Sequence, residues 1–284
     1  MQSVATQLPS SDLTRFCQTN QLTLSNVAQT AWGLVLRAFV GSDDVCFGYL
    51  TSGRDIPLRG VGEALGPLIN MLVCRIDFSN ALSLADLLRR VQEDHNQNNR
   101  HQHVSLAEIK SSLQLPDIPL FNTIVSLQRG GIARAVTSEG SVEIEAVKGE
   151  DPTEYDMVLN VWVQGDTTEL ALNYWTSFVS EGQAATILDT FTQALSEITS
   201  KVTQSAADMN LFGPRSRDQV WQWNKQMPAQ VNRCAHDLIK ERNLERPEMP
   251  AVCAWDGDFT YGELDQKATQ LAARLSPKHS MQRS

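Results

Sequence analysis

The 284-residue sequence lacks any run of Lys and Arg and any long apolar run. Its formal net charge is −9, which argues against the basic surface that binds nucleic acid. No segment approaches the roughly 20 apolar residues that span a bilayer, and residues 1–20 have no apolar signal-peptide core. We therefore expect a cytoplasmic protein that binds neither nucleic acid nor membrane.

Cysteine is scarce. The five cysteines are widely spaced, odd in number and form no C-x-x-C pair, so neither a disulfide framework nor a structural zinc site is predicted. His101 and His103 could be two ligands on one strand face, but no Cys or carboxylate pair with ligand spacing lies nearby. A polar cluster at a helix end is the favoured interpretation, with no bound metal.

The usual catalytic signatures are also missing. The sequence has no G-x-S-x-G elbow and no G-x-x-x-x-G-K-[ST] loop. Gly60, Gly62 and Gly66 miss the G-x-G-x-x-G spacing by one residue and precede a predicted strand. Glu143 and Glu145 alternate with apolar residues, which is typical of the solvent face of a strand. No residue is an obvious general base, so the motifs indicate no self-contained catalytic centre.

Hydrophobic residues make up 42% and charged residues 20% of the chain, as in soluble globular domains. Apolar residues at helical spacing predict two helices in 11–39, a long helix after Ser83, a short one near 106–113 and another after Ser180. The predicted strands are 45–50, 71–78, 121–127, 142–147, 155–163 and 169–175, with hairpin chemistry at Gly165-Asp166. A mixed sheet with packed helices is the simplest architecture for this order.

The end of the chain has a different organisation. Residues 205–232 read as a linker, in which Trp221 and Trp223 are expected to bury their rings against a neighbour. Residues 233–275 predict a helix, a break, a short strand, a turn and a second helix, followed by an unpatterned tail. A unit that stops so soon cannot close a core, so we expect the chain to be a truncated piece of a larger protein.

Several local phrases occur along the chain in a characteristic order. They are Gly41-Ser42-Asp43-Asp44-Val45, Ser52-Gly53-Arg54, the segment from Leu65 to Arg75, His101-Gln102-His103, Pro119 to Thr123 and Phe259-Thr260-Tyr261-Gly262-Glu263-Leu264. Together they resemble the C-terminal lobe of a nonribosomal peptide synthetase condensation domain. The last phrase resembles the first core motif of the adenylation domain that follows it.

The resemblance implies an α/β fold, namely half of a chloramphenicol-acetyltransferase-like two-lobe fold with a mixed sheet and packed helices. Residues 1–204 would be the condensation C-terminal lobe and 205–232 the condensation–adenylation linker. Residues 233–275 would be an incomplete adenylation start, and 276–284 a tail.

The family's chemistry is the condensation of aminoacyl thioesters carried on phosphopantetheine arms, in secondary-metabolite peptide biosynthesis. The H-H-x-x-x-D-G motif of that reaction belongs to the N-terminal lobe, and this sequence has no His-His pair and no H-x-x-x-D. The adenylation part ends before any nucleotide motif. The resemblance therefore implies a fragment that binds no cofactor and is inactive alone, with carrier domains and the missing N-terminal lobe as partners.

The resemblance also suggests roles for particular residues. The Gly/Pro-rich loop 52–67 would form part of the tunnel floor, Asn70 and Arg75 would fix that loop by hydrogen bonds, and Phe121–Gln128 would line the acceptor side. The resulting site candidates are Gly53, Arg54, Gly66, Asn70, Arg75, Asn122 and Ser126. The alternative is that Asn70, Arg75 and Asn122 are ordinary turn and strand residues.

Two other functional interpretations stay open. The chain could be a non-catalytic module that docks onto a carrier protein or onto an N-terminal lobe supplied in trans. It could also be a stand-alone acyltransferase of the chloramphenicol-acetyltransferase type, although the absence of H-x-x-x-D counts against this.

Overall fold

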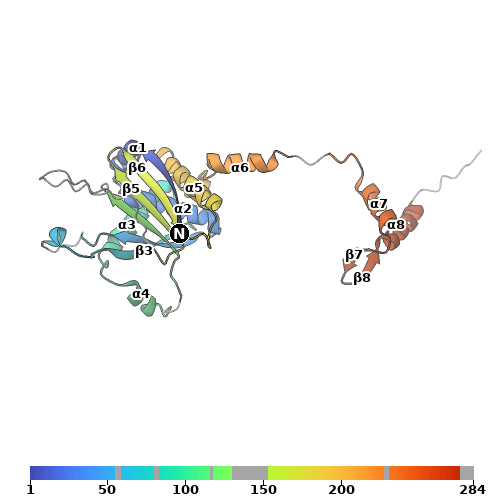
Figure 1. Cartoon of the computed structure of the whole chain (residues 1–284), viewed down its shortest axis with the longest axis horizontal. Helices are drawn as coiled ribbons and strands as arrows, with labels where there is room; N and C mark the ends of the chain where they lie inside the picture. The colour runs from blue at the N-terminus through green and yellow to red at the C-terminus, as the bar shows by residue number, and fades with distance from the viewer. Residues whose placement is uncertain (55–58, 80–82, 116–117, 130–152, 227–229, 276–284) are drawn as a thin grey trace, which may run out of the picture. The chain divides into compact units, whose positions relative to one another are not determined.

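A computed structural model describes the chain except for residues 55–58, 80–82, 116–117, 130–152, 227–229 and 276–284 (Figure 1). The chain divides into two compact units, Met1–Trp223 and Asn224–Ser284, and each is described by itself. Their junction falls within 205–232, the segment interpreted as a linker. No helix of the described part is long and apolar enough to cross a membrane.

A six-stranded mixed sheet forms the centre of the first unit. Its strands, in spatial order, are β1 (Gln2–Pro9), β6 (Thr167–Tyr174), β5 (Met157–Gln164), β4 (Thr123–Arg129), β2 (Asp44–Thr51) and β3 (Asn70–Asp77). The β2–β4 and β4–β5 pairs are parallel, and the other three are antiparallel. The predicted mixed sheet is thus confirmed.

Several helices of this unit begin at a capping residue. The helices are α1 (Ser10–Asn20), α2 (Leu24–Val40), α3 (Leu84–Asn99), α4 (Leu106–Ser112), α5 (Glu181–Ser200) and α6 (Pro214–Asn224), with short 3-10 turns η1 (Val61–Glu63) and η2 (Ala206–Asp208). The side chains of Thr23, Ser83 and Ser180 accept backbone N–H bonds at the starts of α2, α3 and α5.

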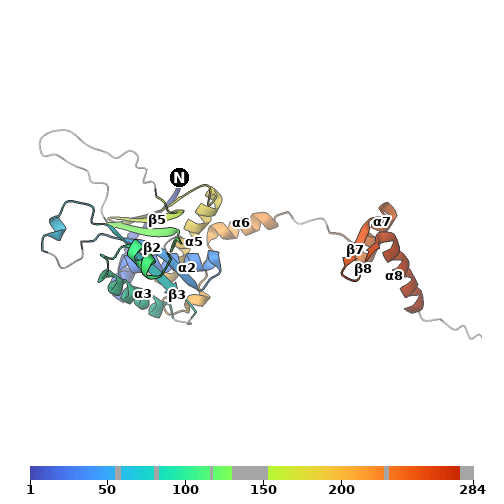
Figure 2. The ribbon, with the colours of Figure 1, turned by 90° about the horizontal axis from the view of Figure 1, so that it is seen from below.

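One face of the sheet carries the main core. Helices α1, α2, α3 and α5 pack on that face (Figure 1 and Figure 2), and Trp32 of α2 meets Phe191 of α5 edge-on, with 6.1 Å between ring centroids. Both rings are fully buried. Phe121, Ile124 and Val158 form a smaller cluster of their own, against which Leu106 of α4 packs.

The sequence patterns did not predict strand β1, nor helix α6, which lies within the segment interpreted as a linker. Strand β1 pairs with β6 along its whole length, from Gln2↔Tyr174 to Pro9↔Thr167. Val4, Thr6 and Leu8 are half-buried and the residues between them are exposed, as expected for a strand at the edge of the sheet. The predicted strand 142–147 lies outside the described residues.

The second unit has the predicted helix, short strand, turn and second helix, and it has in addition a second strand, β8, that was not predicted. Its elements are α7 (Ala235–Glu245), β7 (Pro250–Ala254), β8 (Gly257–Thr260) and α8 (Tyr261–Leu275). None of its described residues is buried, and Leu244 and Trp255 are 83% and 98% exposed. The described part of this unit therefore has no closed hydrophobic core.

The expected burial of the two linker tryptophans is wrong. Trp221 and Trp223 lie on α6 and are each 72% exposed. Two residues separated by one position point about 200° apart on a helix, so a single packing surface cannot bury both rings.

Candidate functional site

The segment between β2 and β3 is a loop whose two ends lie close together. We call these ends, Thr51–Gly53 and Leu68–Asn70, the neck of the loop. Thr51 and Asn70 pair in register at the ends of the two strands, and η1 stands off the end of the sheet (Figure 2). Gly53 has φ 65°, and a Cβ at this position would collide with the carbonyl oxygen of Leu68. Only glycine fits this close approach without strain.

Arg54 holds the far part of this loop. Its Nη1 donates to the carbonyl oxygens of Val61 and Ala64, at 3.0 and 2.9 Å. Its backbone N–H donates to the Ser52 hydroxyl at 3.2 Å. Gly66, the third candidate in the loop, has φ 151°, a conformation that favours glycine.

Asn70 anchors the returning stem of the loop. Its Nδ2 donates to the backbone oxygen of Gln102, in the turn after α3, and its Oδ1 accepts from the N–H of Met71 at 2.8 Å. Asn70 thus contacts the α3 side of the fold, while the hydrogen bonds that brace the loop itself come from Arg54.

Arg75 does not fix the loop, which corrects the role suggested for it. Its guanidinium makes a two-pronged pair with Asp44, with Nε–Oδ1 at 2.9 Å and Nη2–Oδ2 at 2.7 Å. Asp44 begins β2, at the end remote from the loop. The bond to Arg75 lowers the pKa of Asp44 and raises the pKa of Arg75.

Asn122 lies at a cavity of about 620 Å³. Its Nδ2 donates to Oδ2 of Asp156 at 2.8 Å, and its carbonyl oxygen accepts from the N–H of Asp156 at 2.9 Å. These bonds join the starts of β4 and β5. Stacked Phe121 and Tyr155 rings, 5.7 Å apart, line the cavity together with Lys110.

Ser126 lies elsewhere, within the sheet. It pairs with Asn160, which pairs with Ala171, which pairs with Ala5. Because side chains alternate along a strand and Val125 belongs to the main core, this row lies on the opposite face. Ser126 and Asn160 are only 3% and 7% exposed. The predicted site residues therefore divide among a loop, a cavity, a sheet row and a remote ion pair.

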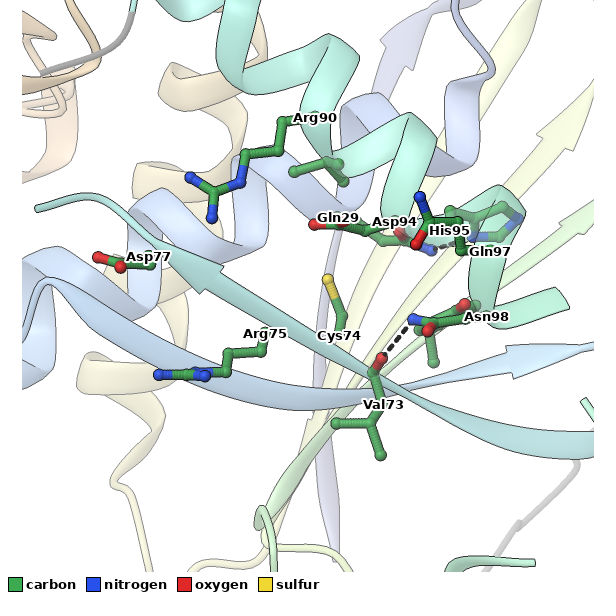
Figure 3. Close-up of a pocket in the computed structure, with 12 residues that line it drawn as sticks. Gln29, Val73, Cys74, Arg75, Asp77, Arg90, Asp94, His95, Gln97 and Asn98 are labelled. Atoms are coloured by element: carbon green, nitrogen blue, oxygen red, sulfur yellow. Dashed lines mark hydrogen bonds between the residues drawn. The ribbon is translucent and has the colours of Figure 1, made fainter. Parts of the chain in front are cut away.

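A second cavity, of about 380 Å³, was not predicted. It lies beneath α3, between that helix and β3 (Figure 3). Gln29 is almost fully buried there, and its amide nitrogen lies 3.4 Å from Nδ1 of His95. The His95 and Tyr49 rings are 5.1 Å apart, and burial raises the pKa of Tyr49. The sequence signal for this cavity is the polar Gln29 in an apolar-rich helix, where Asn26 and Thr30 are buried polar residues as well.

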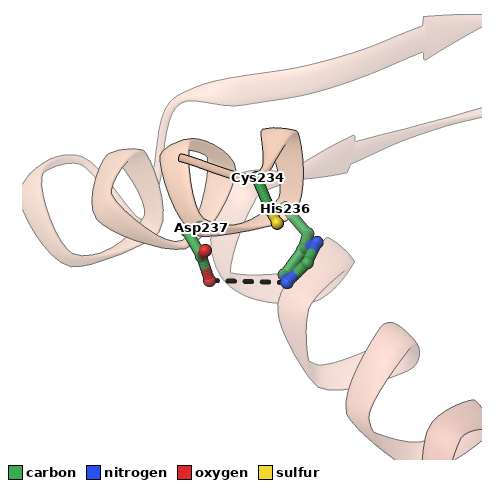
Figure 4. A group of neighbouring side chains, drawn as sticks. All are labelled: Cys234, His236 and Asp237. Carbon is green, nitrogen blue, oxygen red and sulfur yellow. Dashed lines mark ion pairs between the residues drawn. The ribbon is translucent and has the colours of Figure 1, made fainter. Parts of the chain in front are cut away.

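Cys234, His236 and Asp237 gather at the first turn of α7 (Figure 4). Their ligand atoms lie within 4.8 Å of one another, and His236 Nε2 is 3.4 Å from Asp237 Oδ1. Thiol, imidazole and carboxylate groups bind zinc-like ions. However, these three lie on one exposed turn at the positive end of a helix, which disfavours a cation. The cluster alone does not define a metal centre.

The Condensation domain family matches residues 6–221 of the chain. This match covers most of the chain. It includes the last four residues of β1, the other five strands of the sheet and helices α1 to α5. The chain therefore belongs to the condensation-domain family.

Curated relatives support the same family. Nonribosomal peptide synthetase 4 of Gibberella zeae is 39% identical over 265 residues, which cover 93% of this chain and 3% of that protein. Nonribosomal peptide synthetase atnA of Emericella nidulans is 37% identical over 278 residues, which cover 97% of this chain and 4% of that protein. The chain thus spans a few per cent of the length of these relatives.

Solved structures share the fold. A holo four-domain nonribosomal peptide synthetase bound to AMP and glycine matches with a TM-score of 0.67 at 18% identity, over 96% of this chain and 22% of that one. The condensation domain of the Monacolin K polyketide synthase matches with a TM-score of 0.60 at 16% identity, over 72% of this chain and 49% of that one.

Proposed function

We propose that residues 1–204 are the C-terminal lobe of a condensation domain. In a complete synthetase this lobe would help to enclose two carrier-bound aminoacyl thioesters during amide formation. The observation that carries the proposal is the family match over residues 6–221. The match to only 49% of a solved condensation domain is what one lobe of a two-lobe fold would give.

The lobe's own residues would shape the site. The neck of the loop at Gly53 and the brace from Arg54 would hold the tunnel floor in one conformation. The row containing Ser126 and Asn160 would form a buried polar layer on the sheet face opposite the main-core helices. Asn122 would fix the entrance to the acceptor side through Asp156.

The proton-handling imidazole would come from the N-terminal lobe, which carries H-H-x-x-x-D-G in this family. Within the described residues, His101 and His103 are exposed, and His236 pairs with Asp237 on an exposed helix turn. His95 hydrogen-bonds with the neutral amide of Gln29. The chain alone would therefore bind and orient substrates without accelerating amide formation.

The partners would be carrier domains, which bring the phosphopantetheine arms, and the N-terminal lobe. Leu65 and Ile69, on the loop, are 102% and 69% exposed. Exposed apolar side chains on one loop favour burial against another protein surface. A lobe docked on this loop would cover them.

Residues 233–275 would begin an adenylation domain. In the phrase from Phe259 to Leu264, the Thr260 N–H donates to the Glu263 carboxylate at 3.0 Å, and the Glu263 N–H donates to the Thr260 hydroxyl at 3.3 Å. This reciprocal capping starts α8. Because no nucleotide motif follows within the sequence, we expect no amino-acid-dependent ATP–pyrophosphate exchange from this chain.

The proposal is tested by complementation. The purified chain is mixed with aminoacyl-loaded donor and acceptor carrier domains, with and without a separately produced N-terminal lobe from a related synthetase, and amide product is measured by mass spectrometry. We expect product only when the lobe is present. Product from the chain without the lobe would overturn the proposal that the N-terminal lobe supplies the proton-handling imidazole. Tight carrier binding with no product in either mixture would favour a docking module.

A further inference from the structure

Both stems of the loop between β2 and β3 make contact with a single residue, Gln102. The Thr51 hydroxyl donates to Oε1 of Gln102 at 3.5 Å, and Nδ2 of Asn70 donates to the Gln102 backbone oxygen. Thr51 ends β2, Asn70 begins β3, and the two are paired in register. One residue therefore ties together the point where the loop leaves the sheet and the point where it returns.

Gln102 is the inward-pointing residue of an otherwise exposed turn. It is 6% exposed, whereas His101 and His103 on either side are exposed. Burying an amide side chain costs free energy unless its polar atoms are hydrogen-bonded. The Thr51 hydroxyl satisfies the side-chain oxygen of Gln102, and Asn70 bonds instead to its backbone oxygen.

The turn that presents Gln102 is fixed to the end of α3. The His101 N–H donates to the Asn98 carbonyl at 2.9 Å, and the Val104 N–H donates to the His101 carbonyl at 2.9 Å. Helix α3 itself packs into the main core through Leu84, Leu87 and Leu88. The contact thus connects the loop neck to the rigid part of the fold.

We propose that Gln102 is a positioning residue that clamps the neck of the 52–69 loop and so sets the conformation in which the loop meets a partner lobe. The second half of this statement rests on the proposed function, and the clamp itself does not. On the loop side of the clamp, Gly53 and Leu68 approach each other closely, and farther out Arg54 bonds to the carbonyl oxygen of Val61 in η1.

The clamp is tested by amide hydrogen exchange on the full chain, followed in peptides that cover residues 59–69. Thr51→Val keeps the side-chain shape and removes the hydroxyl, and Asn70→Asp keeps Oδ1 and removes the donor. We expect exchange in these peptides to become about fivefold to tenfold faster in each variant, which is the effect of losing one net hydrogen bond. Thr51→Ser, which keeps the hydroxyl, should restore the wild-type rate.

Asn98→Ala is the matched control. Asn98 also donates a side-chain N–H to a β3 backbone oxygen, that of Val73, at 3.1 Å. This contact lies beneath α3 and away from the loop neck, so the loop peptides should exchange within about twofold of wild type. Unchanged loop exchange in Thr51→Val and Asn70→Asp, or equal acceleration in Asn98→Ala, would overturn the clamp.

The proposed effect of the clamp on coupling with a partner lobe is measured in the complementation assay. If the clamp positions the loop against the partner lobe, Thr51→Val should lower the coupling rate at saturating carrier, and Thr51→Ser should recover it. A faster-exchanging loop with an unchanged rate would overturn this proposed effect and leave the clamp standing. Failure of the wild-type chain to couple with any lobe would instead count against the proposed function, while the exchange result would still decide the clamp.

Discussion

Arg54 and Arg75 show how far apart the roles of two similar residues can be. Both make two side-chain hydrogen bonds, but Arg54 braces the loop through backbone oxygens of Val61 and Ala64, and Arg75 pairs with Asp44. The sequence interpretation of Arg as a two-pronged donor was sound. The resemblance suggested that Arg75 fixes the loop, but β3 places this residue at the start of β2, away from the loop.

At Gly53 we predict that Gly53→Ala destabilises the protein by at least ~2 kcal/mol, because the residue has positive φ and its Cβ would meet the Leu68 carbonyl. Gly62→Ala is the control, since a Cβ there meets no atom within 4 Å. It should change stability by no more than about 1 kcal/mol. Urea unfolding measures both, and similar effects would contradict the prediction.

The Asp44–Arg75 pair predicts a pH dependence. The pKa of Asp44 is lowered in the folded state, so the stabilisation is present above the unfolded pKa of about 4 and is lost as the pH falls through the folded pKa. Wild type should therefore be more stable than Arg75→Met at neutral pH, by a small amount because both side chains are exposed. The gap should close at acidic pH in urea titrations. A gap that widens on acidification would refute the assignment.

At the scale of elements, strong local signals gave the right helices. Ser180 and Gln183 form a capping box, in which Ser180 N–H donates to Gln183 Oε1 at 2.9 Å, and α5 begins there. The β5–β6 hairpin turns at Gly165, with φ 55°. Strand β1 has no comparable signal, because its identity depends on pairing with β6, more than 150 residues later in the chain.

We predict that Ser180→Ala destabilises the protein by about 1 kcal/mol through loss of the α5 N-cap. Ser196→Ala is the matched control, because Ser196 is an exposed residue inside the same helix. Alanine has the higher helix propensity, so this control should be neutral or slightly stabilising. Thermal and urea denaturation distinguish the two, and equal losses would show that the cap does not contribute.

At the scale of the whole molecule, the two units differ in how they are stabilised. The first buries Trp32, Phe47 and Phe191 between sheet and helices, whereas no described residue of the second is buried. Burial of apolar area is the main favourable contribution to folding. The second unit, taken alone, therefore has little to oppose the conformational entropy of its chain.

We predict that amides in α7 and α8 exchange hydrogen much faster than those in α2 and α5. Local opening has a low free energy where few apolar contacts are buried. Exchange followed by mass spectrometry on the full chain measures this, and α2, which lies in the main core, is the internal reference. Equal protection in α7 and α2 would show that the second unit has a stability that the described contacts do not explain.

The sequence by itself determined most helix starts, most strands, the hairpin and the family phrases, because caps, turns and alternating apolar residues act over a few positions. Only the tertiary structure decided the pairing of β1, the partner of Arg75, the exposure of Trp221 and Trp223, and the place of Gln102. Each of these depends on residues that are distant in sequence. Local patterns do not encode which distant surfaces meet, so these contacts follow from the packing of the whole sheet and its helices.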